Sequence, residues 1–186
     1  KVNNDNANYG SANAILTADI VVNEGVMTSE STDARVWTPI GDSTNSYSGK
    51  FEGNSKTVSG LYFKNSEVGN VGLFGCINGG TVDNLGVINS YLEGYYNVGG
   101  IVAENINGSI SKCYNTSEII GSSCVGGVVG RISGGSITNC YNAGKAAAIN
   151  LYAGGVVGIC EDGTITNCFN ASENVMSHYY SGAVIG

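Results

Sequence analysis

Six cysteines, one histidine and fifteen acidic residues could carry catalytic or metal-binding chemistry in this 186-residue chain. No two cysteines stand in the Cys-X-X-Cys spacing that is typical of structural zinc sites. The single histidine, His178, lies in a variable segment beside Tyr179 and Tyr180, and a nucleophile triad needs a histidine that is oriented by a carboxylate. We therefore expect a surface histidine, no catalytic residue, no metal ligand and no cofactor.

The carboxylates do not repeat at equivalent positions. Asp83, for example, is replaced by Ser111 and then by Thr138 further along the chain, while Glu161 and Asp162 stand together in a turn. Glycoside hydrolysis uses a pair of carboxylates, and such a pair could still come from non-equivalent positions. Calcium ligation by Glu161 or Asp162 also stays open, although acids in turns are more often simply solvated.

The aromatic residues give a clearer signal than the acids. Six of the eleven tyrosines lie in the variable segments that precede the glycine-rich phrases: Tyr91, Tyr95, Tyr96, Tyr152, Tyr179 and Tyr180. Exposed aromatic rings on a flat face can hold sugar rings or a protein partner. We predict a binding role for these six residues. The alternative is packing inward or against the next rung. We expect the latter for Tyr114, Tyr141 and Phe169, whose regular spacing requires only a stacked ladder.

An internal repeat determines the elements that must position these side chains. Phrases similar to Gly127-Val128-Val129-Gly130 begin at residues 72, 100, 127, 155 and 183, which are 27 or 28 residues apart. A second phrase, Ser136-Ile137-Thr138-Asn139-Cys140, recurs with the same step. Two phrases that share one period indicate a repeat architecture.

Each repeat contains three short apolar segments, which are residues 110–114, 118–120 and 125–129 in one copy. Helices need longer periodic stretches and tolerate glycine poorly, and this chain has 29 glycines. We therefore predict an all-β fold, a parallel β-helix solenoid of about six rungs with 27–28-residue repeats. We expect it to be right-handed, as parallel crossovers nearly always are.

Rungs that stack at ~4.8 Å should place equivalent residues in columns through the core. One predicted column contains Val82, Ile110, Ile137 and Ile165. A second contains Leu61, Leu85, Cys113, Cys140 and Cys168, and a third contains Leu73, Ile101, Val128, Val156 and Val184. Asn115, Asn142 and Asn170 should form a column at a turn, with left-handed backbone angles and hydrogen bonds to their neighbours. Because leucine and cysteine share a column, we expect buried free thiols rather than disulfides.

The composition limits the domains and the partners. We assign residues 1–56 to an N-terminal cap and first irregular rung, with Trp37 and Ile40 closing the end of the core, and residues 57–186 to the repeats of one continuous domain. The net charge is −7 and only eight residues are Lys or Arg, so we expect no nucleic-acid partner. No run approaches ~20 apolar residues, so we expect no membrane insertion by this segment.

Several phrases carry a resemblance to a known family. Gly72-Leu73-Phe74-Gly75 resembles the GLUG motif, and so does the opening from Trp37 to Leu61. The Cys-Tyr-Asn and Val-Gly-Gly-Val-Val-Gly phrases extend the resemblance over residues 13–186. It implies a segment of a large bacterial surface or secreted protein. Some such proteins are adhesin-like, and some carry the repeats beside an immunoglobulin-A-cleaving metallopeptidase, whose His-Glu-X-X-His motif is missing here.

We predict a non-catalytic cell-surface module, either an adhesin-like binding segment or a spacer of a larger bacterial protein. Its partner would be a host glycan or an extracellular protein, its location extracellular or at the cell surface, and its parent chain would hold further repeats or domains. The alternative is a β-helical carbohydrate-active enzyme, a polysaccharide lyase or glycosidase, which requires two or three carboxylates within ~10 Å in a tyrosine-lined groove. A purely architectural stalk would instead bury the irregular tyrosines.

Overall fold

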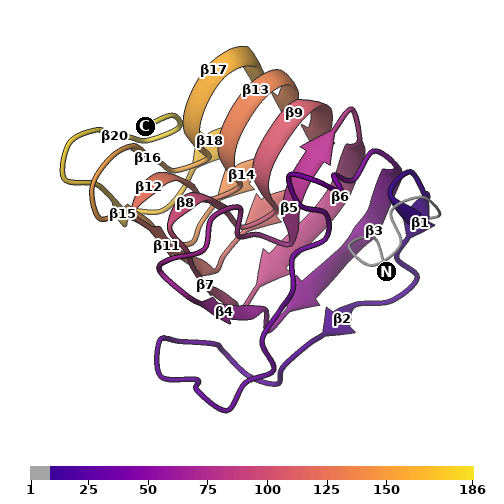
Figure 1. Cartoon of the computed structure of the whole chain (residues 1–186), viewed down its shortest axis with the longest axis horizontal. Helices are drawn as coiled ribbons and strands as arrows, with labels where there is room; N and C mark the ends of the chain where they lie inside the picture. The colour runs from indigo at the N-terminus through magenta and orange to yellow at the C-terminus, as the bar shows by residue number, and fades with distance from the viewer. Residues whose placement is uncertain (1–8) are drawn as a thin grey trace.

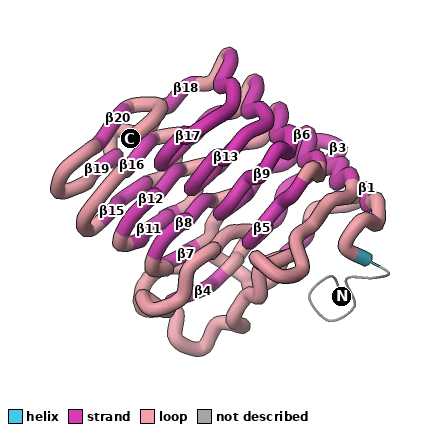
Figure 2. Tube along the Cα trace, turned by 45° about the horizontal axis from the view of Figure 1, so that its top comes forward, coloured by secondary structure: helices cyan, strands magenta, loops and turns pink. Residues whose placement is uncertain are grey.

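The computed structural model describes residues 9–186, which wind into a parallel β-solenoid of about five turns (Figure 1). This confirms the predicted fold, with about five turns where the repeats predict about six. The difference lies in the N-terminal segment, which runs mostly as loops along the first complete turn (Figure 2). Residues 1–8 of the expected cap lie outside the described residues. No helix in the described part is long and apolar enough to cross a membrane.

Three parallel sheets form the walls of the solenoid, as the three apolar segments of each repeat predict. The largest sheet contains β1 (Ala14–Ile15), β2 (Ile20–Val21), β3 (Lys50–Ser59), β5 (Phe74–Asn78), β6 (Thr81–Ile88), β9 (Val102–Ser111), β10 (Tyr114–Asn115), β13 (Val129–Thr138), β14 (Tyr141–Asn142), β17 (Val157–Thr166) and β18 (Phe169–Asn170). The second contains β4 (Tyr62–Lys64), β7 (Tyr91–Glu93), β11 (Glu118–Gly121), β15 (Ala146–Ala148) and β19 (Val175–Met176). The third contains β8 (Tyr96–Gly99), β12 (Ser123–Gly126), β16 (Ala153–Gly154) and β20 (Ser181–Gly182).

Two of the predicted core columns are present in register. Ile137 pairs with Ile110 on one side and with Ile165 on the other, and Val82 pairs with Ile110. Backbone hydrogen bonds connect the third column directly from Ile101 to Val184, and the N–H of Leu73 donates to Gly100 beside Ile101. Both columns belong to one continuous core, because β-branched and aliphatic residues at like positions stack directly on each other.

The prediction for Leu61 is wrong. Phe51, and not Val58, pairs with Val82, so the first step measures 31 residues rather than 24. The step changes from 31 residues at Glu52 to 29 at Lys56, and both Asn54 and Ser55 adopt positive φ there, so a bulge takes up two residues. Leu61 consequently leaves the cysteine column. It is fully buried, and its backbone N–H donates to the hydroxyl of Ser90.

The N-terminal segment lies against the first turn. Its two short strands, β1 and β2, pair with β3, and the loop that follows crosses to the second sheet. Trp37 and Ile40 pack against the core, as expected for residues that close its end. The backbone N–H of Trp37 donates to Tyr62, and that of Ile40 donates to Leu73, so this loop follows the turn that it covers.

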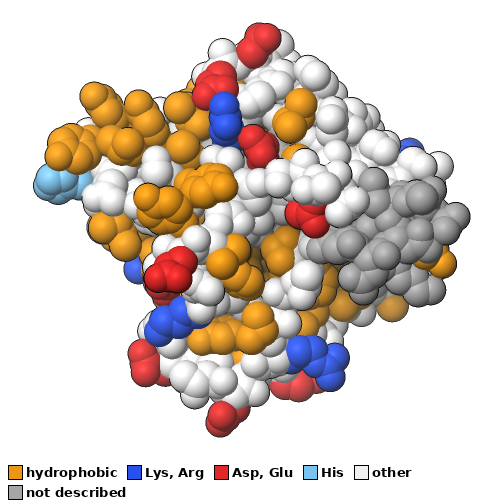
Figure 3. Space-filling view, in the orientation of Figure 1, with side chains coloured by type: hydrophobic (Ala, Val, Ile, Leu, Met, Phe, Trp, Pro, Cys, Tyr) orange, Lys and Arg blue, Asp and Glu red, His pale blue; other side chains and the backbone are white. Residues whose placement is uncertain are grey.

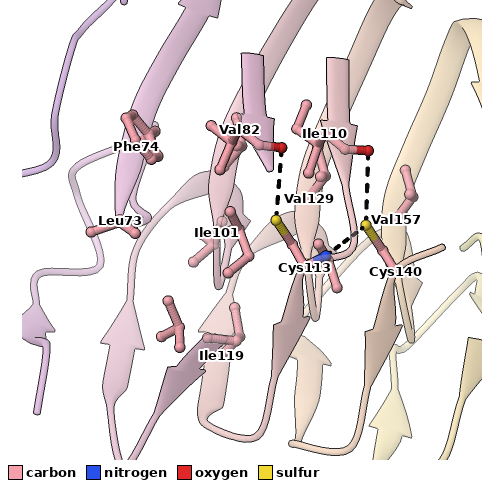
Figure 4. Close-up of a cluster of buried hydrophobic side chains, with 14 of the residues drawn as sticks. Leu73, Phe74, Val82, Ile101, Ile110, Cys113, Ile119, Val129, Cys140 and Val157 are labelled. Atoms are coloured by element: carbon pink, nitrogen blue, oxygen red, sulfur yellow. Dashed lines mark hydrogen bonds between the residues drawn. The ribbon is translucent and has the colours of Figure 1, made fainter. Parts of the chain in front are cut away.

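The cysteine column from Cys113 to Cys168 lies in the core without bridges, and all six cysteines, which lie within residues 9–186, are free thiols. The backbone N–H of Cys113 donates to Sγ of Cys140 at 3.4 Å, and each of these two thiols donates to a carbonyl of the opposite strand (Figure 4). The pKa of Cys140 is raised to about 12, chiefly by its hydrogen bond with the thiol of Cys113 and also by burial. These thiols act as core residues.

Candidate binding surface

Tyr95 and Tyr96 project from the corner at which β8 begins. Their side chains are 49% and 47% exposed, and their rings meet edge to face at 5.6 Å. The ring of Tyr96 covers Gly69 in the preceding turn so closely that a Cβ on this glycine would lie 2.5 Å from it. Both rings are therefore fixed by packing while much of their surface faces solvent.

A second group of aromatic rings stands further along the same corner. Tyr152 stacks on Tyr180 at 5.2 Å, and the ring of Tyr179 lies 6.5 Å from that of Tyr180. Tyr179 is 63% exposed and Tyr180 is 55% exposed. His178 is exposed, as predicted, and contacts the ring of Tyr179 edge to face at 4.6 Å.

The two groups stand on one corner in turns that are not adjacent. Tyr96 has the position of Ser123, whereas Tyr152 and Tyr180 have the position of Cys124, one residue later. The turn between them carries Ser122 and Ser123 at this corner, where Ser123 pairs with Tyr96 and the carbonyl of Ser122 accepts from Asn150. At ~4.8 Å per turn the groups lie roughly 10 Å apart along the solenoid. Hydrophobic side chains gather on this side, where β15 and β20 lie (Figure 3). We call Tyr95, Tyr96, Tyr152, Tyr179 and Tyr180 the tyrosine ridge.

Tyr91, the sixth predicted binding residue, does not lie on this ridge. It is 2% exposed, stacks on Tyr62 at 6.1 Å and packs with Met27 of the N-terminal loop. Its hydroxyl donates to Glu93 at 2.6 Å, and its pKa is raised by burial and by this carboxylate. Tyr91 pairs in register with Tyr62 on one side and with Glu118 on the other, so its packing partner is the tyrosine of the preceding turn.

The regular aromatic ladder is present as predicted. Tyr114 stacks on Tyr141 with ring centroids 5.0 Å apart, and Tyr141 stacks on Phe169 at 5.1 Å, with nearly parallel planes in both pairs. Tyr114 in turn covers Gly86, where a Cβ would lie 2.3 Å from its ring. The ladder holds successive turns together on the large sheet.

A hollow that the sequence does not reveal lies beside Tyr96. It has a volume of about 530 Å³ and is bounded by the loop over residues 36–43 and by the turn over residues 65–70. Its aromatic walls are Trp37, Phe63 and Tyr96. The repeat pattern could not predict this site, because two of its walls come from residues outside the regular turns.

On the large sheet, two acidic residues share one arginine and are not arranged as an acid–base pair. Arg131 lies between Glu104 and Glu161, with N–O distances of 3.4 and 2.7 Å. The hydrogen bond from Arg131 lowers the pKa of Glu161, whereas a general acid needs a raised pKa. Within residues 9–186, no group of three or more His, Cys, Asp and Glu side chains could hold a metal ion.

Comparison with known proteins agrees with this architecture. Residues 94–120 and 121–147 each match the family model for the GLUG motif, so this part of the chain consists of two GLUG repeats, in agreement with the resemblance found in the sequence. No curated protein matches. A crystal structure from Bacteroides ovatus, described as a candidate immunoglobulin A1 protease, shares 21% identity and superposes with a TM-score of 0.77. The alignment covers 100% of this chain and 58% of that chain, and it shows the common fold.

Proposed function

We propose that this GLUG-repeat module is a non-catalytic, adhesin-like segment of a larger bacterial protein at the cell surface or outside the cell. It binds a host glycan or an extracellular protein through the tyrosine ridge. The observation that carries the proposal is the exposure of Tyr95, Tyr96, Tyr179 and Tyr180 in two groups along one corner. Soluble proteins rarely leave large apolar patches open without an interaction to explain them.

The scaffold suits recognition of an extended ligand. Tyrosine presents a flat apolar face and a hydroxyl. Because its side chain has only two torsions, it loses little conformational entropy on binding. Here Tyr96 is fixed by its contact with Gly69, and Tyr152 by its stack on Tyr180. The rings repeat along the solenoid axis, so a polymer that runs along this corner would meet both groups in turn.

Two observations favour binding over the other interpretations. A carbohydrate-active enzyme would need free carboxylates that face a tyrosine-lined groove, whereas Glu104 and Glu161 are engaged by Arg131. A purely architectural stalk would bury these tyrosines, whereas Tyr179 is 63% exposed. The description as a protease belongs to the Bacteroides ovatus protein, and the tyrosines of the ridge provide no protease chemistry.

The test is binding of the purified chain to arrays of immobilised glycans and host matrix proteins. A quadruple variant, Tyr95→Ala/Tyr96→Ala/Tyr179→Ala/Tyr180→Ala, should lose at least about tenfold in affinity, because stacking on each ring contributes roughly 1 kcal/mol. The control is Val21→Ala/Val26→Ala, which removes exposed apolar side chains away from the ridge. Equal binding by wild type and quadruple variant, with both folded, would refute the ridge as the binding surface.

A further inference from the structure

The hollow beside Tyr96 has the size and the lining of a small-molecule site. Its volume of about 530 Å³ falls within the range of about 300–1,000 Å³ that is typical of ligand pockets. Trp37 is held in place by the core and by a hydrogen bond of 3.1 Å from its Nε1 to the carbonyl of Gly72. Phe63 is half-buried on β4, and Tyr96 is fixed over Gly69. Three rings from separate elements therefore line one hollow and are all anchored.

Polar groups lie between these rings. Thr38, Ser43 and Asn65 line the hollow, and within residues 9–186 the two hydroxyls and the Asn65 side-chain nitrogen have no hydrogen-bond partner. The amide of Asn70, which also lines it, is already engaged by Asn97 and Glu104. Free hydroxyl and amide groups beside aromatic faces match a ligand that has both apolar C–H faces and hydroxyls.

The charges in the lining restrict the ligand further. Among the lining residues within 9–186, Asp42 is the one ionisable carboxylate, and its Oδ1 accepts from the backbone N–H groups of Thr44 and Asn45 at 2.8 and 2.7 Å. None of the Lys or Arg residues in the described part of the chain lines the hollow, and the chain carries a net charge of −7. An anionic ligand would meet repulsion from Asp42, and no described cation would offset it.

We infer that this hollow binds a neutral sugar ring, such as a hexose unit of an uncharged glycan, between Trp37, Phe63 and Tyr96. The inference deepens the proposed function and rests on it, since it takes the ligand of the ridge to be a glycan. Tyr96 belongs to both surfaces, so the hollow receives one sugar unit while the chain of the polymer continues along the ridge. Uronic-acid, sialylated and sulfated polymers are disfavoured at this site.

The single tryptophan of the chain makes the hollow directly observable. Trp37 is the only Trp, so its emission and its quenching by acrylamide report on this site and not on the ridge. The probes are maltohexaose, cellohexaose and mannohexaose as neutral ligands, trigalacturonic acid as the acidic one, and a Tyr-containing pentapeptide. At least one neutral oligosaccharide should shift the emission saturably and reduce the quenching constant about twofold or more.

Two variants locate the signal. Val68, which is 40% exposed, lines the hollow, and Val68→Arg should weaken the neutral oligosaccharide at least about tenfold. Val21→Arg places the same side chain at a residue that is 53% exposed and outside the hollow lining, and should leave the affinity unchanged. Neither variant changes a residue of the core cluster, so folding can be checked by the thermal transition.

The outcomes separate the two proposals. If no neutral oligosaccharide changes the Trp37 signal, or if the acidic probe or the peptide changes it more strongly, the inference about the hollow is wrong. In that case, array binding that is lost in the quadruple tyrosine variant still supports the proposed function. A triple variant, Tyr95→Ala/Tyr179→Ala/Tyr180→Ala, tests the ridge alone, because it keeps Tyr96 in the hollow. Array binding unchanged in this variant, with a Trp37 response retained, would reject the ridge and keep the hollow.

Discussion

The side-chain amide of Asn115 donates a hydrogen bond of 2.9 Å to Oδ1 of Asn142, and both side chains are completely buried inside the solenoid. In the same way, the side-chain amide of Asn142 donates to Oδ1 of Asn170 at 3.0 Å. Each amide also bonds to the backbone two residues further on, as Asn142 does with Gly144. The interior therefore contains a continuous ladder of amides in which every turn satisfies the next.

We expect Asn142→Leu to destabilise the protein by about 3 kcal/mol or more. The substitution removes one of the two partners of the Asn115 amide nitrogen and one of the two partners of the Asn170 amide oxygen. It also removes both side-chain hydrogen bonds to the backbone of Gly144, and each buried unsatisfied group costs about 1–3 kcal/mol. Urea unfolding measures the change. Asn150→Ala, which removes an exposed bond to Ser122, is the control and should cost less than about 1 kcal/mol. A similar midpoint for the two variants would show that the ladder contributes little.

The repeated glycines contact this ladder directly. A Cβ at Gly127 would lie 2.2 Å from Cγ of Asn142 and 2.3 Å from the carbonyl oxygen of Gly155. Because backbone atoms cannot move aside easily, we expect Gly127→Ala to cost about 2–3 kcal/mol through overpacking. The measurement is the free energy of unfolding in urea.

Gly79 provides the matched control for Gly127. A Cβ there would meet nothing within 4 Å, and its φ of 73° is one that asparagine tolerates. Gly79→Asn should therefore change stability by less than about 1 kcal/mol. If Gly127→Ala proves as mild as Gly79→Asn, the close approach of Gly127 to the asparagine ladder is not a packing constraint.

The asparagine ladder shows what the repeat could predict and what it could not. The hydrogen bonds between Asn115, Asn142 and Asn170 were predictable, because a fixed period places like residues above one another. The expected left-handed angles were wrong for these three residues and occur instead at Asn139 and Asn167, which precede the cysteines. Residue type suggested an αL position, but burial and strand pairing decided which asparagine occupies it.

The repeat spacing could not predict the hollow or the register of the first turn. Leu61 was misplaced because the first step measures 29 to 31 residues on the two sides of a bulge, whereas aligning the sequence phrases gave 24. Trp37 could be assigned to the end of the core, but its position opposite Phe63 and Tyr96 depends on how an irregular loop crosses the turns. The repeat period thus predicted the sheets of the solenoid. The hollow between a sheet and the irregular loop could be found only from the three-dimensional structure.

The two kinds of variable tyrosine should respond differently to truncation. Tyr91 is buried against Tyr62 and Met27, so Tyr91→Ala should cost about 3 kcal/mol, whereas Tyr95→Ala should cost less than about 1 kcal/mol because its ring is half exposed. Tyr91→Phe keeps the ring and should recover most of the loss. Thermal and urea denaturation check all three variants. Equal losses at Tyr91 and Tyr95 would contradict the division of the tyrosines into packed and exposed groups.

The buried thiol column should make stability fall in mild alkali. Burial and hydrogen bonding raise the pKa of Cys140 from 9.0 to about 12, so between these values the unfolded chain releases a proton that the folded chain keeps. The contribution of the Cys140 thiol to the free energy of unfolding is fully present below pH 9 and is lost as the pH rises toward 12. Linkage over the unfolded pKa of 9.0 gives a loss of about 1 kcal/mol between pH 8 and pH 10 from Cys140. Urea unfolding in the presence of a reductant measures this difference.

A variant isolates Cys140 from the other groups that titrate in this range. Cys140→Val keeps an apolar side chain in the column and removes the thiol, so the loss of stability between pH 8 and pH 10 should shrink by about 1 kcal/mol, whatever its stability at pH 8. Cys124→Ser is the control, because Cys124 lies outside the column and is only partly buried. An unchanged pH dependence in Cys140→Val would mean that this thiol ionises in the folded protein as easily as in the unfolded chain.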